Sequence, residues 1–297
     1  MKRNIERPWF AAMATVLIAL AVFSCVGWAY IHYLKSSKQQ IGRSLAQAFA
    51  LRISQRTSET VSPVYMLASL VKQNTGNIPD FEKVASDLIS EFPLVRALEL
   101  APAGVVRQAY PLRGNEAIIG HDLLKDKERN REAHIAMAKR QMMLAGPFDL
   151  IQGGLGAVAR YPVFLSGSQG KNTFWGFTIV VIRVNELLMS AGQMELERNG
   201  YGFQICRVMP EVEEGNCKVF VRTSETEMQD PLVVMVELPN NQWQLSVAPV
   251  AGWVSRGEWI ATIAFIIGGA LLAGLLQFVR LEQLRLERRE GEASSSF

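Results

Sequence analysis

The residue types that most often carry out catalysis are few in this chain and lie far apart. Its three histidines, His32, His121 and His134, do not have the spacing of a metal site. The motifs H-E-x-x-H and G-x-S-x-G and the phosphate-binding P-loop are all absent from the sequence. We therefore expect no enzyme activity, no metal site and no cofactor.

A glycine-rich run, Gly153-Gly154-x-Gly156, lies between two strand-like segments. A dinucleotide-binding fingerprint instead connects a strand to the start of a helix. The run therefore does not predict nucleotide binding. We expect these glycines to form a tight turn or to allow a close backbone approach at a pocket.

Arg160 is a candidate for contact with a ligand. In the strand-like run AVARYPVF, side-chain alternation places Arg160 on one face with Val158, opposite Ala159 and Tyr161. A guanidinium between apolar neighbours can pair with a ligand carboxylate or phosphate. It can equally lie on the solvent face of the sheet, and the sequence leaves both interpretations open.

Three further side chains have one interpretation in a binding site and a simpler structural one. Asp149 can hydrogen-bond a ligand, or it can cap the loop in which it lies. Tyr161 and Trp175 can stack on a ligand ring, or they can belong to the core of a sheet. Spacing alone does not decide between these roles.

The three cysteines have different surroundings. Cys25 lies within an apolar run, where a thiol behaves as a small hydrophobic group. Cys206 and Cys217 flank the turn-like segment MPEVEEGN between two strand-like runs. If this region is exported, we expect a disulfide between them, with two free thiols as the alternative.

Two uncharged apolar runs dominate the hydropathy pattern, Trp9–Ile31 and Trp259–Val279. Each is long enough to cross the hydrocarbon core as a helix. The first has a longer apolar region than a cleaved signal peptide, and the second is too long and uncharged for an ordinary soluble core. We expect two transmembrane helices, at residues 9–31 and 259–279.

The charges that flank these runs predict their orientation. Basic residues on the outer sides are Lys2, Arg3 and Arg7 before the first run, and Arg280, Arg285, Arg288 and Arg289 after the second. Lys35 and Lys38 weaken this bias, but it still predicts that residues 1–8 and 280–297 are cytoplasmic and residues 32–258 exported. With 31 Lys and Arg against 28 Asp and Glu, nothing indicates nucleic-acid binding.

The exported region reads as a mixed α+β domain. Apolar spacing predicts a long stalk helix over residues 35–74, packed either against a second copy or against its own domain. Further helices are expected at Asp80–Glu91, Asp122–Met143 and Asn185–Arg198. Short β-branched and aromatic runs between and after these helices predict two modules built on antiparallel sheets.

Several motifs in the middle of this region resemble, in order and spacing, the CHASE family of extracytoplasmic sensor domains. They are a Tyr-Pro pair, Asn-Glu, Gly-x-Asp-Leu-Leu, a charged helix, Leu-Ala-Gly-Pro, Leu-x-Gln-Gly-Gly, a Pro-Val strand and a Trp-Gly-Phe strand, all within residues 86–192. The later segment PLVVMVELPNNQWQLSVAPVAGW, within a trailing module at residues 200–253, is similar to the part that follows the domain in bacterial members.

The resemblance implies a long stalk helix carrying two PAS-like modules between two transmembrane helices. It also implies ligand contacts from the module at residues 86–192, where Tyr110, Arg129 and Ile151 join the candidates. The plant hormone receptors of the family have a small hydroxylated residue in place of Arg160 and an Asp in place of Arg129. Both departures argue against a cytokinin ligand.

We therefore expect a sensor in the bacterial inner membrane that binds an unknown small molecule outside the cytoplasm. A homodimer would carry the signal to a cytoplasmic output domain or partner, of the histidine kinase or nucleotide cyclase type that the family implies. The alternative is a membrane-anchored adaptor whose exported domain recruits a partner protein.

Overall fold

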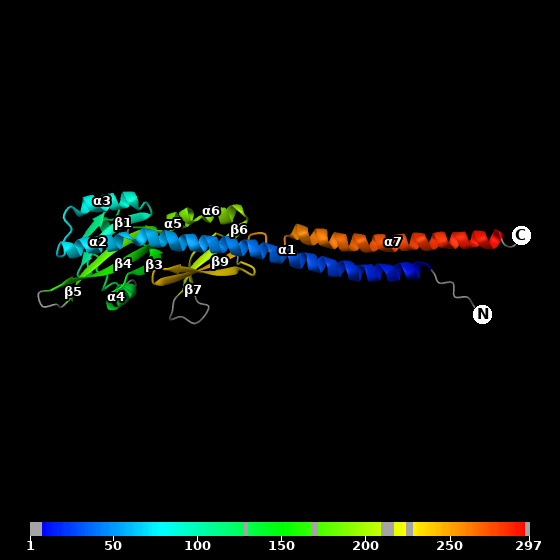
Figure 1. Cartoon of the computed structure of the whole chain (residues 1–297), viewed down its shortest axis with the longest axis horizontal. Coiled ribbons are helices and arrows are strands. Elements are labelled where there is room, and N and C mark those ends of the chain that lie inside the picture. The colour runs from blue at the N-terminus through cyan, green and yellow to red at the C-terminus, as the bar shows by residue number, and fades with distance from the viewer. Residues whose placement is uncertain are drawn as a thin grey trace. The chain divides into compact units, whose positions relative to one another are not determined.

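The structure is a computed structural model that describes residues 8–127, 130–151, 153–167, 172–208, 217–223 and 228–294. The chain forms two compact units. The helical unit comprises Met1–Ile41 and Ala251–Phe297, and the sheet unit comprises Gly42–Val250. Helix α1 (Pro8–Val61) passes from the first unit into the second without a break (Figure 1).

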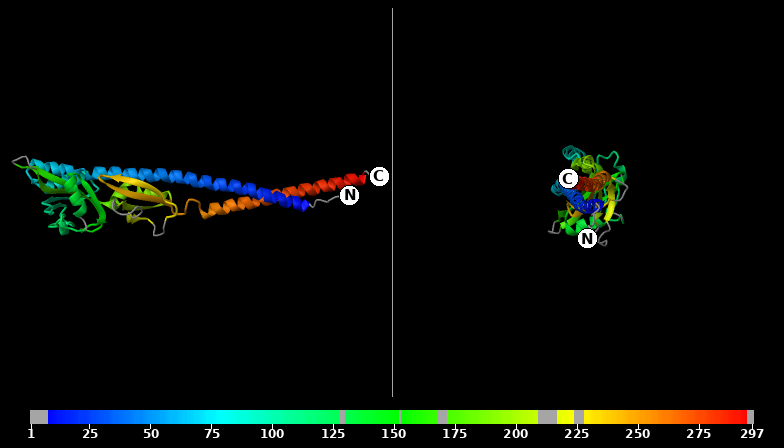
Figure 2. Two further views of the ribbon diagram at one scale, coloured as in Figure 1. Left: turned by 90° about the horizontal axis from the view of Figure 1, so that it is seen from below. Right: turned by 90° about the vertical axis from the view of Figure 1, so that its right-hand side faces the viewer.

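The helical unit contains the two apolar runs, which form the first part of α1 and most of α7 (Arg256–Ser294) (Figure 2). Both helices are long and apolar enough to cross a membrane, with mean hydropathies of 2.3 and 2.2 over their most apolar windows. Only 6% and 17% of these windows are buried. Such exposure argues against the alternative of a core helix in a soluble protein.

Small residues allow α1 and α7 to pack closely in the helical unit. A Cβ atom on Gly27 would lie 2.8 Å from Ile266 Cδ1, and one on Gly269 would lie 2.8 Å from the Phe23 ring. Phe23 and Phe265 meet edge to face, with ring centroids 5.3 Å apart. Close contact through glycine is the usual way in which apolar helices associate within a bilayer.

A polar cluster lies where α7 begins, immediately before its apolar run. Ser255 and Glu258 form a capping box: the backbone N–H of Ser255 donates to Glu258 Oε2 at 2.8 Å, and the N–H of Glu258 donates to Ser255 Oγ at 3.3 Å. Lys38 of α1 donates to both carboxylate oxygens of Glu258 at 2.9 Å. The same carboxylate therefore caps α7 and ties it to α1.

The sheet unit contains two antiparallel sheets. The first has the strand order β2-β1-β5-β4-β3. Its strands are β1 (Val95–Pro102), β2 (Gln108–Tyr110), β3 (Met143–Asp149), β4 (Leu155–Ser166) and β5 (Asn172–Arg183). The second has the order β7-β6-β9-β8 and consists of β6 (Tyr201–Val208), β7 (Cys217–Arg222), β8 (Leu232–Leu238) and β9 (Asn241–Pro249).

Helices cover the first sheet on both faces. They are α2 (Pro63–Gln73), α3 (Phe81–Glu91), the short 3₁₀ helix η1 (Glu116–Ile118), α4 (Asn130–Lys139) and α5 (Val184–Ala191). Helix α6 (Gln193–Arg198) lies instead against β6 of the second sheet. On one face, the buried Thr178 donates to the carbonyl of Val64 in α2 at 2.8 Å. On the other, Ala133 and Ala136 of α4 pack in one apolar core with Ile179. These observations confirm the predicted α+β architecture.

Two contacts between side chain and backbone join the first sheet to the second. Asn240 and Asn241, at the turn between β8 and β9, donate to the carbonyls of Met142 and Leu144 at 2.7 and 2.8 Å. An ion pair between Arg207 of β6 and Glu132 of α4 adds to this junction, with both side chains largely buried. The two sheets are therefore coupled by polar groups as well as by α1.

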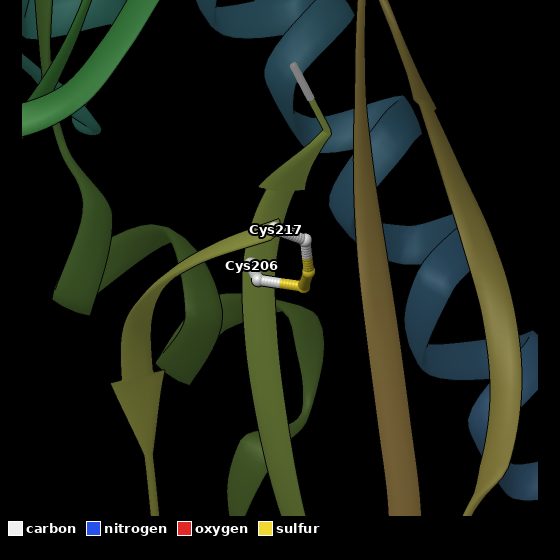
Figure 3. Close-up of a disulfide and its surroundings, with 2 residues drawn as sticks. All are labelled: Cys206 and Cys217. Atoms are coloured by element: carbon white, nitrogen blue, oxygen red, sulfur yellow. A yellow bond between two sulfur atoms is a disulfide. The ribbon is translucent and has the colours of Figure 1, made fainter. Parts of the chain in front are cut away.

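Cys206 and Cys217 form a disulfide at one end of the β6–β7 pair, as the sequence predicts (Figure 3). Their Cα atoms lie 5.5 Å apart, a usual distance for such a bridge. The intervening residues 209–216 lie outside the described part of the chain.

Three helix boundaries differ from the predictions. The stalk of residues 35–74 is divided between α1 and α2, because Pro63 has no N–H to continue the helical hydrogen bonding. The predicted Asn185–Arg198 helix breaks at Gly192, which has a left-handed φ of 101°. The prediction of a helix over Asp122–Met143 was wrong, because among the described residues of this segment only Asn130–Lys139 is helical and Met143 begins β3.

Candidate functional site

The strand register brings two residues of opposite charge to one face of the first sheet. Glu99 of β1 lies opposite Ile179 of β5, and Ile179 lies opposite Arg160 of β4 on its other side. Residues directly opposite one another project to the same face of a sheet. Glu99 and Arg160 therefore flank Ile179, and the next row on this face is Ala97, Val181 and Val158.

A pocket opens over this row. Its enclosed volume is about 20 Å³, which is room for little more than one water molecule. It is lined by Glu99, Ile118, His121, Leu123, Phe148, Leu150, Ile151, Val158, Arg160 and Val181. The floor is thus the sheet, and the walls come from the segment after η1 and from the end of β3. This volume is well below the range of about 300–1,000 Å³ for small-molecule sites.

The pocket combines an apolar wall with two deeply buried charged side chains. Glu99 and Arg160 each expose only 2% of their surface. Burial of a charge in an apolar setting is costly unless another group compensates it. Most other lining residues are aliphatic, and Glu99, Arg160 and His121 are the polar side chains of the wall.

One wall of the pocket is held by short polar contacts. His121 lines the pocket, and its Nε2 lies 3.2 Å from Asp126 Oδ2. Asp122 accepts hydrogen bonds from the N–H groups of Leu124 and Lys125 at 3.1 and 3.3 Å, which holds a turn here. A hydrogen bond from the Lys125 side chain is the main reason why the pKa of Asp122 lies below its usual value.

The glycine-rich run shapes the opposite wall. Gly153 and Gly154 have φ values of 84° and 81° and form the turn between β3 and β4. Leu150 lies against Gly156 so closely that a Cβ atom there would collide with its side chain. Both the tight turn and the close approach at a pocket were expected, and both are present.

Of the residues predicted to contact a ligand, Arg160 and Ile151 line the pocket. Tyr161 faces the other way and meets Tyr65 of α2, with ring centroids 5.0 Å apart. Burial, followed by the proximity of Tyr161, raises the pKa of Tyr65. Trp175 donates from Nε1 to the carbonyl of Gly76 at 3.0 Å, so its polar group is used in a link between elements.

The remaining predicted contacts also lie elsewhere. Tyr110 is opposite Leu98, a neighbour of Glu99 on the other face of β1. Asp149 is exposed at the end of β3 and does not line the pocket. Arg129 lies outside the described residues.

Two polar residues of the pocket, Glu99 and His121, were not identified as ligand contacts from the sequence. The run VRALELAP contains a signal for Glu99, since strand alternation places it with Ala97 and Ala101 on an otherwise apolar face. His121 has no comparable signal, because a loop position has no periodicity. Within the described residues, no group of three His, Cys, Asp or Glu side chains could hold a metal ion.

Comparison with solved structures shows the fold. The structure is similar to an extracellular ligand-binding receptor from Desulfohalobium retbaense, with a TM-score of 0.54 and 14% identity over 69% of this chain and 39% of that chain. This establishes a shared fold, and the chain spans well under half of that protein. No curated protein matches the chain.

Other similar structures have lower scores. The extracellular domain of a protein assigned as a histidine kinase, rpHK1S-Z16, has a TM-score of 0.46 and 12% identity over 71% of this chain and 94% of that chain. The sensory domain of the Campylobacter jejuni chemoreceptor Tlp3 has a TM-score of 0.36 and 12% identity over 81% and 97% of the two chains.

The fold and the pocket define an extracytoplasmic sensor domain of the PAS-like α+β type. Residues 74–216 match the family model of the CHASE domain, so the chain carries a CHASE domain in its sheet unit. This confirms the family that the sequence motifs predict. The domain is the extracellular ligand-sensing domain of a signalling receptor, with a candidate membrane helix on each side of it.

Proposed function

We propose that this chain binds a small molecule in the pocket over β1, β4 and β5 and passes the signal across the bacterial inner membrane. The spans are the apolar runs of α1 and α7, and both termini are cytoplasmic. The receiver is a cytoplasmic output domain or partner of the kinase or cyclase type. The chain itself acts by binding and has no catalytic role.

The observation that carries this proposal is the pair of charged side chains on the pocket wall. Glu99 and Arg160 are each 98% buried and lie in a row with Ile179. A core that served stability alone would gain from apolar groups at these positions, because buried charges rarely increase stability. Buried charged groups that line a cavity are candidates for ligand binding.

The connection to the membrane supports a signalling role. The helix that supplies the first span continues in the sheet unit, where Phe49 packs edge to face against Phe203 of β6 at 5.4 Å. Interface helices in receptors commonly shift by a few ångströms between states. A ligand shifts such an equilibrium only by binding one arrangement more tightly than the other.

The proposal is tested by a thermal-shift screen of the full chain in detergent against small metabolites, followed by calorimetry. Arg160→Ala should weaken a ligand found in this way by about 1.5–3 kcal/mol, as expected for a hydrogen bond to a charged group. The control is Arg183→Ala, which removes an exposed Arg of β5 that pairs with Glu186 at 2.8 Å. Equal affinity in the Arg160 variant and the control would contradict a ligand role for this pocket.

We also propose that the receptor is a homodimer whose protomers meet along α1. Single cysteines at positions 41–53 should crosslink in native membranes with helical periodicity, and ligand should change the pattern. A complete lack of crosslinks across this series would favour a monomeric binding module.

A further inference from the structure

We infer that the helical unit holds a binding site for a compact, apolar ring compound with one hydrogen-bond acceptor, which enters from the membrane. The site is a cavity between α1 and α7, separate from the pocket over the first sheet. The inference goes beyond the proposed function and shares with it only the placement of the two apolar runs in the bilayer.

The cavity lies between the two apolar runs, close to the end at which Lys38 pairs with Glu258. It encloses about 330 Å³, which is within the range of roughly 300–1,000 Å³ for small-molecule sites. Each helix contributes three lining residues, which are Val26, Gly27 and Tyr30 of α1, and Ala261, Thr262 and Phe265 of α7. An occupant of the cavity therefore contacts both helices at once.

Small residues and fixed rings keep this space open. Gly27 brings no side chain into the cavity, and Ala261 brings only a methyl group. The helices already touch beside it, because a Cβ atom on Gly27 would lie 2.8 Å from Ile266 Cδ1. The Phe265 ring is held edge to face against Phe23, with ring centroids 5.3 Å apart. The cavity is thus bounded by residues that the packing of α1 on α7 holds in place.

The height of the cavity favours a compact occupant over a lipid tail. The lining segments 26–30 and 261–265 each rise by roughly 6 Å along their helix axes, at 1.5 Å per residue. An acyl chain extends through half of the hydrocarbon core, roughly 15 Å. Most of such a chain would lie outside the cavity, whereas a molecule of two or three rings can lie within it.

The lining residues favour rings and a single polar group. Tyr30 and Phe265 supply one aromatic ring from each helix, and rings attract one another in offset or edge-to-face arrangements. The Tyr30 hydroxyl can donate to a ligand oxygen, whereas the Thr262 hydroxyl donates to the carbonyl of Glu258 at 2.8 Å. Lipid tails are as apolar as any ligand, so ring contacts and the Tyr30 hydroxyl must determine what binds.

Photolabelling of the full chain in phosphatidylcholine vesicles tests the site. The probe is benzophenone, which has two rings and one carbonyl. Under light its carbonyl takes a hydrogen atom from a nearby C–H group, and the two carbon radicals then join. Peptide mapping should place most of the label on segments 26–30 and 261–265. Fluorenone should compete at an about fivefold lower concentration than fluorene, which has the same rings and no carbonyl.

Two substitutions with matched controls assign the contacts. Ala261→Leu fills the cavity and should reduce the labelling of both segments about fivefold, whereas Ala264→Leu, at an exposed position outside the lining, should not. Tyr30→Phe should make fluorenone and fluorene equally effective, whereas Tyr33→Phe, also outside the lining, should keep their difference. If a variant does not fold, the two competitors on the unmodified protein still decide.

Other occupants of the cavity give different results. Label spread evenly along both helices and unchanged by Ala261→Leu would overturn the inference and assign the cavity to lipid tails. A disulfide between two copies that carry Ala261→Cys and Cys25→Ser would overturn it in favour of a second chain. None of these substitutions changes the pocket over the first sheet, so either result leaves the proposed function intact. A failed metabolite screen would likewise leave this site standing.

Discussion

Trp175 lies at the start of β5 and holds the loop after α2 in place. Its indole N–H donates to the carbonyl of Gly76. A Cβ atom added to Gly76 would lie only 2.8 Å from Trp175 Nε1, so the indole needs glycine at this position. Gly76 has a φ of 102°, a conformation that side chains rarely adopt. The pair therefore positions α2 and α3 around the sheet.

Trp175→Phe tests this structural role. The ring is largely kept while the hydrogen bond is lost, so the free energy of unfolding should fall by about 1 kcal/mol. Urea unfolding of the detergent-solubilised chain measures this change. The affinity for a pocket ligand should stay within twofold, and a loss of 10-fold or more would return Trp175 to the binding site.

At the scale of single residues, side-chain alternation in strands predicted which residues face the pocket, whereas residue type did not. The placement of Arg160 on the face of Val158 followed from a period of two and agrees with the pocket. Aromatic type suggested ring stacking for Tyr161 and Trp175, yet both contact parts of the protein outside the pocket. Which face is the pocket depends on which helices cover it, and that depends on contacts distant in sequence.

At the scale of elements, the start of α7 is sensitive to acid. The pKa of Glu258 lies below its usual value of 4.5, first because Lys38 donates to it and next because the Ser255 N–H does. A carboxylate with a lowered pKa in the folded state stabilises that state above the unfolded pKa. This stabilisation is lost as the pH falls from about 4.5 through the lowered pKa.

Glu258→Gln and Ser255→Ala should therefore loosen the first turn of α7. Loss of an N-cap costs about 1 kcal/mol, so amides in this turn should exchange with deuterium about fivefold faster at pH 7. At each pH, the amide exchange rate of the Glu258→Gln variant is divided by that of the unmodified protein. This ratio should approach one in acid, where Glu258 of the unmodified protein is protonated. Ser255→Thr keeps the hydroxyl and is the control, and a ratio independent of pH would contradict the assignment.

The existence of most helices and strands could be predicted from periodicity, but several ends could not. The segment from Asp122 has helical composition, yet its carboxylate accepts two backbone N–H groups and forms a turn instead. β3 was not predicted as a strand, because MMLAGPF is equally compatible with a buried strand and a buried helix. Pairing with β4 decided the outcome.

At the scale of the whole molecule, the junction between the two sheets depends on a buried ion pair. Glu132 and Arg207 are 9% and 16% exposed, so removal of one partner leaves a buried charge. Glu132→Gln should lower the free energy of unfolding by about 3–5 kcal/mol, and Glu132→Gln with Arg207→Met should recover part of the loss. Urea unfolding would measure both, and a neutral single variant would show that the junction does not need the pair.

The orientation in the membrane is a second prediction at this scale. Reporter fusions after residue 150 and at residue 297 should report opposite compartments, because the basic flanks favour cytoplasmic termini. Alkaline phosphatase should be active at the first site and green fluorescent protein at the second. Cytoplasmic signals from both sites would contradict an exported domain.

Helix α1 is unbroken from Pro8 to Val61, so a rotation at one point of the helix is carried along its length. A continuous helix turns by roughly 100° per residue, so its two ends share one rotational setting. One alanine inserted within residues 37–40 would rotate the part of α1 after the insertion by about 100° relative to the part before it. Seven inserted residues, close to two full turns, would nearly restore the original rotation. Signalling by such a receptor should therefore depend periodically on insertion length and not only on the sequence inserted.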